Sequence, residues 1–170
     1  MRQTGQRIAV LLHNVRSTHN VGSIFRTSEA AGVEKIYLSG VTPTPEDRFG
    51  RVQKDIAKTA LGAERMLPWE KTSSTSKVIR KLKGEGWEIV GVEQDTRAID
   101  YRKFSAGGGS SSGGRASKPT LIIFGNEVKG IPKSVRDACD TLIEIPMNGK
   151  KESLNVSVAA GIILFAFPKT

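Results

Sequence analysis

The stretch IAVLLHNVRSTHNVGSIFRTSEAAGVEKIYL, residues 8–38, decides the fold. It opens on the apolar run Ile8–Leu12, which is typical of a buried strand. A helix is expected to begin near Asn20, whose side chain could cap free backbone N–H groups, and to stop at Gly32. A second apolar strand follows at Lys35–Leu38. This succession of strand, helix and strand predicts an α/β fold with a largely parallel sheet.

The same alternation continues along the chain. Further strands are expected at Trp87–Val92, Leu121–Phe124 and Thr141–Ile145, and further helices at Asp55–Ala63, Ser76–Lys83, Pro132–Ala138 and Leu154–Phe167. The last helix is apolar nearly all round, so we expect it to be buried in the domain or at an interface. The run Gly-Gly-Gly-Ser-Ser-Ser-Gly-Gly at 107–114 predicts a flexible surface loop over about 105–118. With no internal repeat, residues 1–170 are expected to form a single domain.

The charge of the chain indicates a polyanionic partner. Lys and Arg number 26 against 17 Asp and Glu, which gives a formal net charge of +9. Such a field concentrates nucleic acid near the surface, and nucleic acid is the default partner of a domain this basic. An anionic membrane is the weaker alternative because no basic amphipathic helix stands out. The apolar run at 162–167 is too short to span a bilayer.

Cysteine and histidine content argues against disulfides and metal sites. The one cysteine, Cys139, falls in an expected helix and is interpreted as a small buried residue. His13 and His19 lack the spacing of metal ligands, so no metal is expected. With no signal peptide or membrane-spanning run, the chain is expected in the cytoplasm.

Several motifs of nucleotide and hydrolytic enzymes are missing from the sequence. There is no Gly-x-x-x-x-Gly-Lys-Ser/Thr loop, no Gly-x-Gly-x-x-Gly after the first strand and no Gly-x-Ser-x-Gly elbow. These absences argue against a nucleotide-hydrolysing motor and an α/β-hydrolase. A dinucleotide-dependent oxidoreductase becomes a distant alternative.

Two polar clusters at the edges of apolar elements are candidates for the chemistry. In residues 20–27 (Asn-Val-Gly-Ser-Ile-Phe-Arg-Thr), Arg26 lies either on a solvated helix face or against a phosphate or reacting hydroxyl, which its donor fork suits. In residues 124–132 (Phe-Gly-Asn-Glu-Val-Lys-Gly-Ile-Pro), the glycines are turn residues or let a ligand approach the backbone. Glu127 is either an exposed loop carboxylate or a partner that orients a cation such as Arg26.

A third cluster joins residues 145–149 (Ile-Pro-Met-Asn-Gly) to residues 153–157 (Ser-Leu-Asn-Val-Ser). Ser153 can be interpreted as an N-cap of the last helix. Asn155 needs a hydrogen-bond partner, because a polar side chain beside a strongly apolar helix is rarely left unpaired. Each of the three clusters is ambiguous when it is taken alone.

Together, and in this order, the clusters resemble the motifs of the SpoU/TrmH group of RNA 2′-O-ribose methyltransferases in the SPOUT superfamily. The first matches the family's Asn-x-Gly-x-x-x-Arg motif and the second its strand-Gly-Asn-Glu-x-x-Gly motif. The third matches Ile-Pro-Met-x-Gly followed by Ser-Leu-Asn-Val-Ser. The resemblance runs from about Ile8 to Phe167.

The resemblance implies a parallel-sheet SPOUT fold with a C-terminal deep trefoil knot, which periodicity would not suggest because knots are rare. It implies S-adenosylmethionine as cofactor, contacted by Gly125, Ile145 and Leu154, and by Glu93 after the strand that begins at Trp87. It also implies a homodimer in which the active site is completed across the interface.

The resemblance further implies a central catalytic role for Arg26. Around it the family places Asn20, Glu127, Ser153 and Asn155. A guanidinium with a pKa above ~12 is a poor base, so our hypothesis is that Arg26 grips an RNA phosphate and stabilises negative charge developing on oxygen. The expected function is methyl transfer from S-adenosylmethionine to a ribose 2′-hydroxyl of RNA, with tRNA favoured over rRNA.

Two alternatives share this fold. One is a SPOUT methyltransferase that acts on a base nitrogen, which the first motif with its Arg26 disfavours. The other is a non-catalytic RNA-binding protein, which the five intact candidate catalytic residues disfavour.

Overall fold

The structure is a computed structural model, and it describes residues 6–105 and 118–167. The flexible loop expected at 105–118 falls almost wholly on residues 106–117, which lie outside the described residues.

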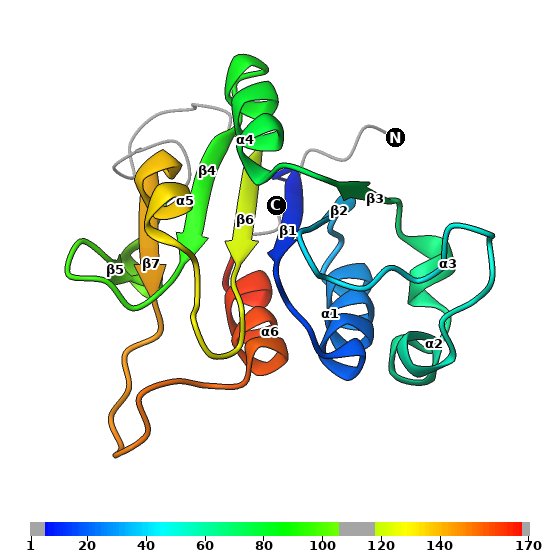
Figure 1. Ribbon diagram of the computed structural model, residues 1–170. Helices are drawn as coiled ribbons and strands as arrows, with labels where there is room; N and C mark the ends of the chain where they lie inside the picture. The colour runs from blue at the N-terminus through cyan, green and yellow to red at the C-terminus, as the bar shows by residue number, and fades with distance from the viewer. Residues whose placement is uncertain (1–5, 106–117, 168–170) are drawn as a thin grey trace.

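A parallel sheet forms the centre of the molecule (Figure 1). Within the described residues it has seven strands in the order β3-β2-β1-β6-β4-β7-β5, and every neighbouring pair is parallel. The strands are β1 (Ile8–His13), β2 (Lys35–Ser39), β3 (Trp69–Thr72), β4 (Glu88–Val92), β5 (Ile99–Asp100), β6 (Thr120–Phe124) and β7 (Thr141–Glu144). The α/β fold with a parallel sheet is therefore confirmed.

Helices cover both faces of the sheet (Figure 1). They are α1 (Thr18–Ala30), α2 (Lys54–Ala60), α3 (Ala63–Met66), α4 (Thr75–Gly84), α5 (Lys133–Ala138) and α6 (Val156–Ala166), with a short 3₁₀ turn η1 (Tyr101–Lys103). The buried side chains of α1, α2, α3 and α6 belong to one core cluster, and those of α4 and α5 belong to a second.

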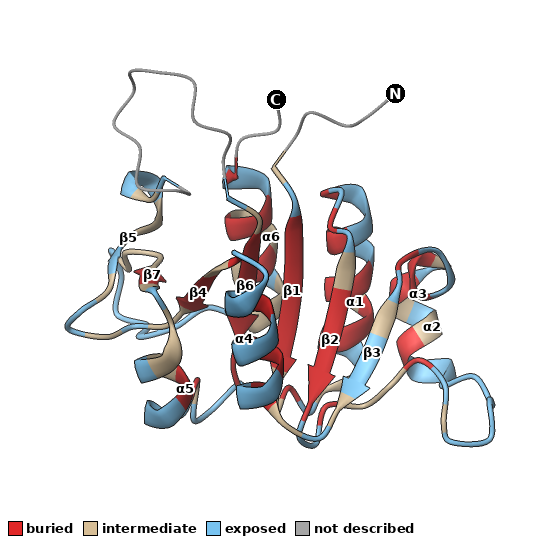
Figure 2. Ribbon diagram, turned by 90° about the horizontal axis from the view of Figure 1, so that it is seen from above, coloured by how far each residue is buried: buried red, intermediate tan, exposed pale blue. Residues whose placement is uncertain are grey.

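The central strands supply both cores, since their side chains alternate between the two faces. In β1, Val10 and Leu12 join the first core cluster, whereas Ala9 and Leu11 join the second. Figure 2 shows the resulting band of buried residues along β1, β2 and β6. Burial on both faces explains why these strands are continuous apolar runs in the sequence.

Two expected helix starts are wrong by a few residues. Helix α1 begins at Thr18, and its N-cap is Ser17, whose hydroxyl accepts a hydrogen bond from the Asn20 N–H at 3.2 Å. Helix α6 begins at Val156 with Asn155 as its N-cap, so neither Asn20 nor Ser153 has a capping role. In both cases a small polar residue nearer the true start does the capping.

The expected helix over Asp55–Ala63 is interrupted. Leu61 and Gly62 adopt positive φ angles of 52° and 96°, which ends α2 and lets α3 start in a new direction. A left-handed residue is a common helix stop, and here it is Leu61 and not the more usual glycine.

Strands β3 and β5 were not predicted because both lie at the edges of the sheet. β3 reads Trp-Glu-Lys-Thr and pairs only with β2, so two of its four side chains are exposed. β5 has only two residues. Edge strands are often short and charged, which removes the apolar pattern that identifies central strands. Across the described ranges, no helix has the length and apolar character needed to cross a bilayer.

Close packing between α1 and α2 depends on Gly22. A Cβ at this position would lie 2.4 Å from the backbone oxygen of Ile56. Gly22→Ala is expected to lower the free energy of unfolding by about 1–3 kcal/mol, because overpacking outweighs the roughly 1 kcal/mol gained in helix propensity. Urea denaturation measures the change. Gly84→Ala in α4, where a Cβ meets nothing within 4 Å, is the control and should be neutral or stabilising. Equal effects of the two substitutions would contradict this account.

Candidate active site

A pocket of about 210 Å³ opens at the carboxyl ends of β4, β6 and β7. Its lining residues come from the segments that follow these strands and from the start of α6, and they fall in 92–94, 124–128, 130, 144–145, 147, 153–156 and 159. In an open parallel sheet, the crevice beyond the carboxyl ends of the strands is the usual ligand site. The second and third polar clusters of the sequence therefore meet in one place.

The loop after β6 folds back tightly on itself. Asn126 and Gly130 exchange backbone hydrogen bonds of 3.2 and 2.9 Å, and the Asn126 side-chain oxygen accepts from the N–H groups of Val128 and Lys129. A Cβ at Gly125 would lie 2.5 Å from the carbonyl carbon of Gly130. Only glycine fits there, so the two ends of the loop can pack backbone against backbone beside the pocket.

Glu93, directly after β4, holds this loop from the other side. Its Oε2 accepts a hydrogen bond from the Ile131 N–H at 2.7 Å, and its Oε1 accepts from the Gln94 N–H at 3.0 Å. Gly130 has a φ of +65°, and a Cβ there would lie 2.0 Å from the Glu93 carboxylate. The close approach of glycine and carboxylate fixes one wall of the pocket.

Glu127 joins the loop after β6 to the start of α1. Its carboxylate accepts from the backbone N–H groups of Arg16 (3.2 Å) and Ser17 (3.1 Å) and from the Asn20 side-chain amide (3.3 Å). The Asn20 Oδ1 in turn accepts from the Asn155 Nδ2 at 3.2 Å. One continuous network thus links all three clusters.

These donors change the acidity of Glu127. Burial acts to raise its pKa, but the surrounding N–H donors outweigh burial and hold the pKa below its ordinary value of 4.5. The carboxylate therefore stays ionised at neutral pH, and its role in this structure is to accept hydrogen bonds.

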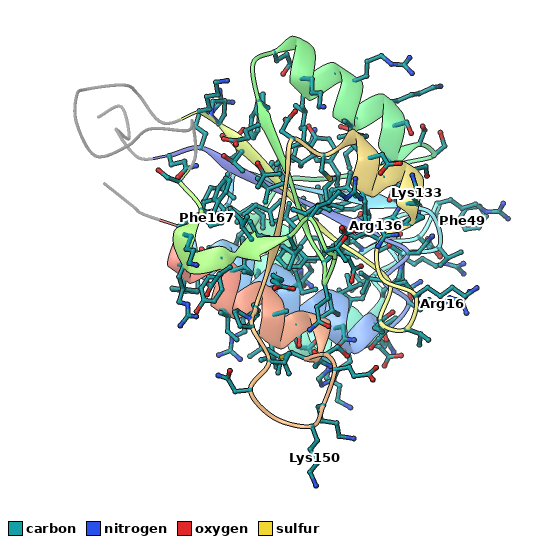
Figure 3. The ribbon with its side chains drawn as sticks, turned by 90° about the vertical axis from the view of Figure 1, so that its left-hand side faces the viewer. Arg16, Phe49, Lys133, Arg136, Lys150 and Phe167 are labelled. Atoms are coloured by element: carbon teal, nitrogen blue, oxygen red, sulfur yellow. The ribbon has the colours of Figure 1, made fainter. Side chains whose placement is uncertain are left out.

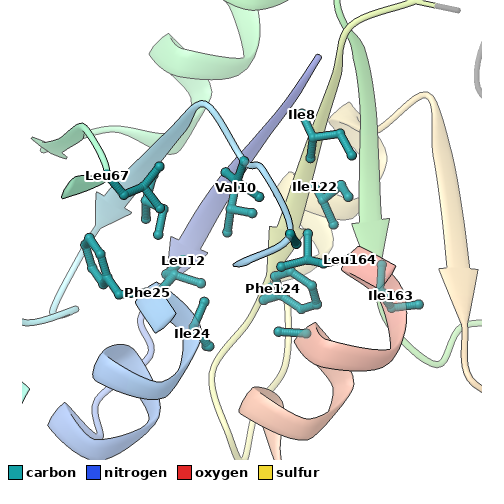
Figure 4. Packing of buried hydrophobic residues seen from close by; sticks show 14 of the residues in the cluster. Ile8, Val10, Leu12, Ile24, Phe25, Leu67, Ile122, Phe124, Ile163 and Leu164 are labelled. Atoms are coloured by element: carbon teal, nitrogen blue, oxygen red, sulfur yellow. The ribbon is translucent and has the colours of Figure 1, made fainter. Parts of the chain in front are cut away.

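The segment from β7 to α6 closes the remaining side of the pocket and carries Lys150 on its protruding turn (Figure 3). Asn155 anchors its end, since its Oδ1 accepts from the N–H of Ser157 (2.8 Å) and from the Ser157 hydroxyl (2.6 Å). Helix α6 itself is fixed by Ile163 and Leu164, which are fully buried in the core that also holds Phe124 (Figure 4). The hydrogen bonds of Asn155, the N-cap of α6, explain why an asparagine stands beside this apolar helix.

Most of the candidate residues line the pocket. They are Glu127, Ser153 and Asn155 from the catalytic set, and Gly125, Ile145, Leu154 and Glu93 from the cofactor set. Asn20 does not line it but lies behind it, 7% exposed, with its amide bonded on both sides. Its geometry is that of a positioning residue.

Arg26 is the exception. It lies exposed on α1, outside the pocket lining, and makes no hydrogen bond or ion pair with any residue in the described ranges. Within one chain Glu127 does not contact Arg26, because its carboxylate accepts hydrogen bonds from the backbone N–H groups of Arg16 and Ser17 and from Asn20.

One important residue was missed in the sequence. Asn126 shapes the loop after β6 and also donates from its Nδ2 to the backbone oxygen of Asn14 at 2.9 Å. Its position between Gly125 and Glu127 in the motif was the available signal. Cys139 is largely buried, and this burial raises the pKa of its thiol to about 12, in line with a packing role.

Comparison of the chain with known proteins identifies its family. The model of the SpoU rRNA Methylase family matches residues 7–165. The chain belongs to the SpoU rRNA methylase family. It is 31% identical over 161 residues to the 23S rRNA (guanosine-2′-O-)-methyltransferase RlmB of Ralstonia nicotianae, covering 95% of this chain and 58% of the relative. The chain thus spans less than two thirds of the curated relatives that it matches.

Solved structures of the SpoU family have the same fold. An AdoMet-bound rRNA methyltransferase from Sinorhizobium meliloti superimposes with a TM-score of 0.81 at 28% identity, over 98% of this chain and 57% of that chain. The A. aeolicus TrmH/SpoU tRNA modifying enzyme superimposes with a TM-score of 0.77 at 28% identity, over 96% and 76% of the two chains.

The hydrogen bonds of Glu127 predict a pH-dependent stability. The pKa of Glu127 is lower in the folded state than its ordinary value of 4.5. Its ionised carboxylate therefore stabilises the fold fully at pH values above 4.5, and this stabilisation is lost as the pH falls from 4.5 through the folded-state pKa. Glu127→Gln is expected to lower the free energy of unfolding by about 1 kcal/mol in neutral buffer. The difference in free energy of unfolding between this variant and the native chain should become smaller in acid. Urea denaturation across this range measures the gap.

Glu29→Gln provides the matched control, since Glu29 is exposed on α1 and pairs with no charged residue in the described segments. It should change stability little at any pH. A Glu127→Gln gap that is the same in neutral and acidic buffer would contradict the proposed hydrogen bonding.

Proposed function

We propose that this chain transfers a methyl group from S-adenosylmethionine to a ribose 2′-hydroxyl of RNA. The observation that carries the proposal is the meeting of the three motif segments at a pocket beyond the carboxyl ends of β4, β6 and β7. A relative that shares 31% identity is named as a 2′-O-methyltransferase, and a solved structure with the same fold has AdoMet bound.

The pocket has features that suit the cofactor. Gly125 lines it with backbone alone, while Ile145 and Leu154 offer apolar surface for an adenosine. We propose these three as its main contacts, with Glu93 adding the unused lone pairs of its carboxylate. When bound, S-adenosylmethionine supplies an activated methyl group, so the protein needs only to position the acceptor and manage its charge.

The remaining residues are proposed to prepare the ribose. Ser153 is exposed at the pocket and has no hydrogen-bond partner within the described residues, so its hydroxyl is available to the substrate. Asn155 and Asn20 hold the segment around Ser153 in place through their mutual hydrogen bond. The methyl group moves to the 2′-oxygen, the hydroxyl proton leaves to solvent, and S-adenosylhomocysteine is the second product.

Arg26 is proposed to act across a homodimer. It is exposed and lies outside the pocket of its own chain, while α6 carries exposed apolar side chains at Val158 (51%) and Phe165 (58%) that a second copy could cover. In this arrangement the partner's Arg26 reaches the pocket, grips an RNA phosphate and stabilises charge on the 2′-oxygen.

The proposal extends to the remaining features of the fold and substrate. We propose a single methyltransferase domain over 1–170 with a C-terminal knot. What supports the knot is the place of β6 between β1 and β4, to which the chain returns after those strands have been laid down. Both tRNA and rRNA are candidate substrates, because the named relatives include a 23S rRNA methyltransferase and a tRNA modifying enzyme.

The reaction is tested by incubating the protein with methyl-labelled S-adenosylmethionine and either total tRNA or deproteinised rRNA, then identifying the labelled nucleosides by mass spectrometry. Label on ribose is the expected result. Label on a base would establish the base-nitrogen alternative, and the absence of label with both RNAs would support a non-catalytic RNA-binding protein.

The role of Arg26 has its own test. Arg26→Ala and Arg26→Lys are expected to lower turnover by about 100-fold or more, because the charge-stabilising donor is lost or misplaced. Affinity for S-adenosylmethionine, measured by calorimetry, should stay within about 2-fold, since the contact proposed for Arg26 is to the RNA and not to the cofactor. A parallel loss of turnover and cofactor affinity would overturn this assignment.

A mixing experiment tests whether Arg26 acts across the dimer. Arg26→Ala and Asn155→Ala each damage a different half of the shared site. Co-refolding the two inactive variants should restore part of the activity, because one site of each mixed dimer then has both native residues. Activity that stays at the level of the single variants would show that both residues serve the same chain.

A further inference from the structure

The loop between β2 and α2 exposes an aromatic side chain flanked by cations. Phe49 is 67% exposed. The guanidinium carbons of Arg48 and Arg51 lie 4.7 and 5.2 Å from the centroid of its ring, within cation–π distance. Figure 3 shows Phe49 at the outer margin of the molecule, away from the core.

Asp47 holds this loop in one shape. Its Oδ1 accepts from the N–H groups of Phe49 (2.8 Å) and Arg51 (3.0 Å), and its Oδ2 accepts from the Arg51 Nε at 2.7 Å. Gly50 reverses the chain with a φ of +74°. Because these bonds already fix the backbone at Phe49, a ligand that packs on its ring loses little additional entropy in ordering the loop.

The surface beside Phe49 is hollowed, and its lining carries the cations Arg48, Arg51 and Lys71 against the carboxylates Glu46 and Asp47. Thr42, Trp69 and Lys71 contribute to the hollow. The Lys71 ammonium donates to the backbone oxygens of Gly40 (2.6 Å) and Thr42 (2.7 Å), and neither Lys71 nor Arg48 pairs with a carboxylate in the described residues. An aromatic surface next to such cations suits a base and its phosphate.

This loop lies at the same edge of the sheet as the candidate active site. It follows the carboxyl end of β2, and parallel strands present these ends to the same side. Figure 2 shows this exposed loop beside α2, on the β3 side of the sheet. Three strand spacings separate β2 from β4, which is about 15 Å. Arg16, which is exposed in the segment after the intervening β1, adds a cation between the Phe49 loop and the candidate active site.

We propose that Phe49, with Arg48 and Arg51, is a stacking platform for an unpaired base of the RNA, several nucleotides away from the ribose that is methylated. Aromatic rings and guanidinium planes stack on any base, while Arg48 and Lys71 attract the adjoining phosphates. This inference rests on the proposed RNA-modifying function, and it adds a second RNA contact outside the pocket.

The test compares RNA binding by Phe49→Ala, Phe49→Leu and Phe49→Trp with that of the native chain. Fluorescence anisotropy uses a labelled stem–loop RNA with an unpaired loop and a fully paired duplex as probes. The Ala and Leu variants should bind the stem–loop about 5- to 150-fold more weakly, the range for loss of one base–aromatic stack, while Trp preserves affinity. Duplex binding should change little.

Two control substitutions remove similar groups elsewhere. Met66→Ala removes an apolar side chain that is 70% exposed and lies outside the hollow, and Arg80→Ala removes a positive charge from α4. Met66→Ala should leave stem–loop affinity unchanged, and Arg48→Ala should weaken it more than Arg80→Ala does.

Three outcomes would overturn the platform. They are unchanged stem–loop affinity in Phe49→Ala, an equal loss on the duplex, or an altered oligomeric state of this variant in sedimentation. Binding of S-adenosylmethionine and RNA methylation by the native chain test the proposed function separately. A native chain that methylates RNA, together with unaffected Phe49 variants, would refute the platform alone.

Discussion

The Glu127 carboxylate accepts hydrogen bonds from the backbone before α1 and from the Asn20 amide, and Asn20 bonds to Asn155, 135 residues further along the chain. Everything proposed for the site depends on this contact, because it brings the three motif segments into one arrangement. Its donors are backbone N–H groups and amides, which keep the same charge at any ordinary pH. The lowered pKa of Glu127 ensures that the accepting charge is present as well.

The parallel sheet makes this contact possible. The loops after β1, β4, β6 and β7 all emerge at one edge, and the two glycines of the β6 loop allow backbone to pack against backbone there. Helix α6, buried at Ile163 and Leu164, then carries Asn155 to the same edge. The candidate site is thus built from loops that are short and internally bonded, on a frame of buried strands, which suits a reaction that depends on positioning.

Sequence reasoning was most successful where a pattern has one physical cause. Apolar runs predicted β1 and β6, because a strand covered on both faces has few polar positions. The second and third motifs fall on segments that line the pocket, whereas residues 20–27 of the first motif do not line it. The partner of Glu127 could not be predicted, since it depends on which backbone N–H groups lie opposite in space. The polar edge strand β3 and the left-handed Leu61 were missed because neighbouring segments, and not local preference, determine them.

A double-mutant cycle on Glu127→Gln and Asn155→Ala tests the central claim most directly. These two side chains share Asn20 as their common partner, so each substitution alone should disable the same network. Turnover of RNA methylation in the double variant should fall little below that of the more damaged single variant. Losses that multiply in the double variant would contradict the claim, because they would show that Glu127 and Asn155 act independently.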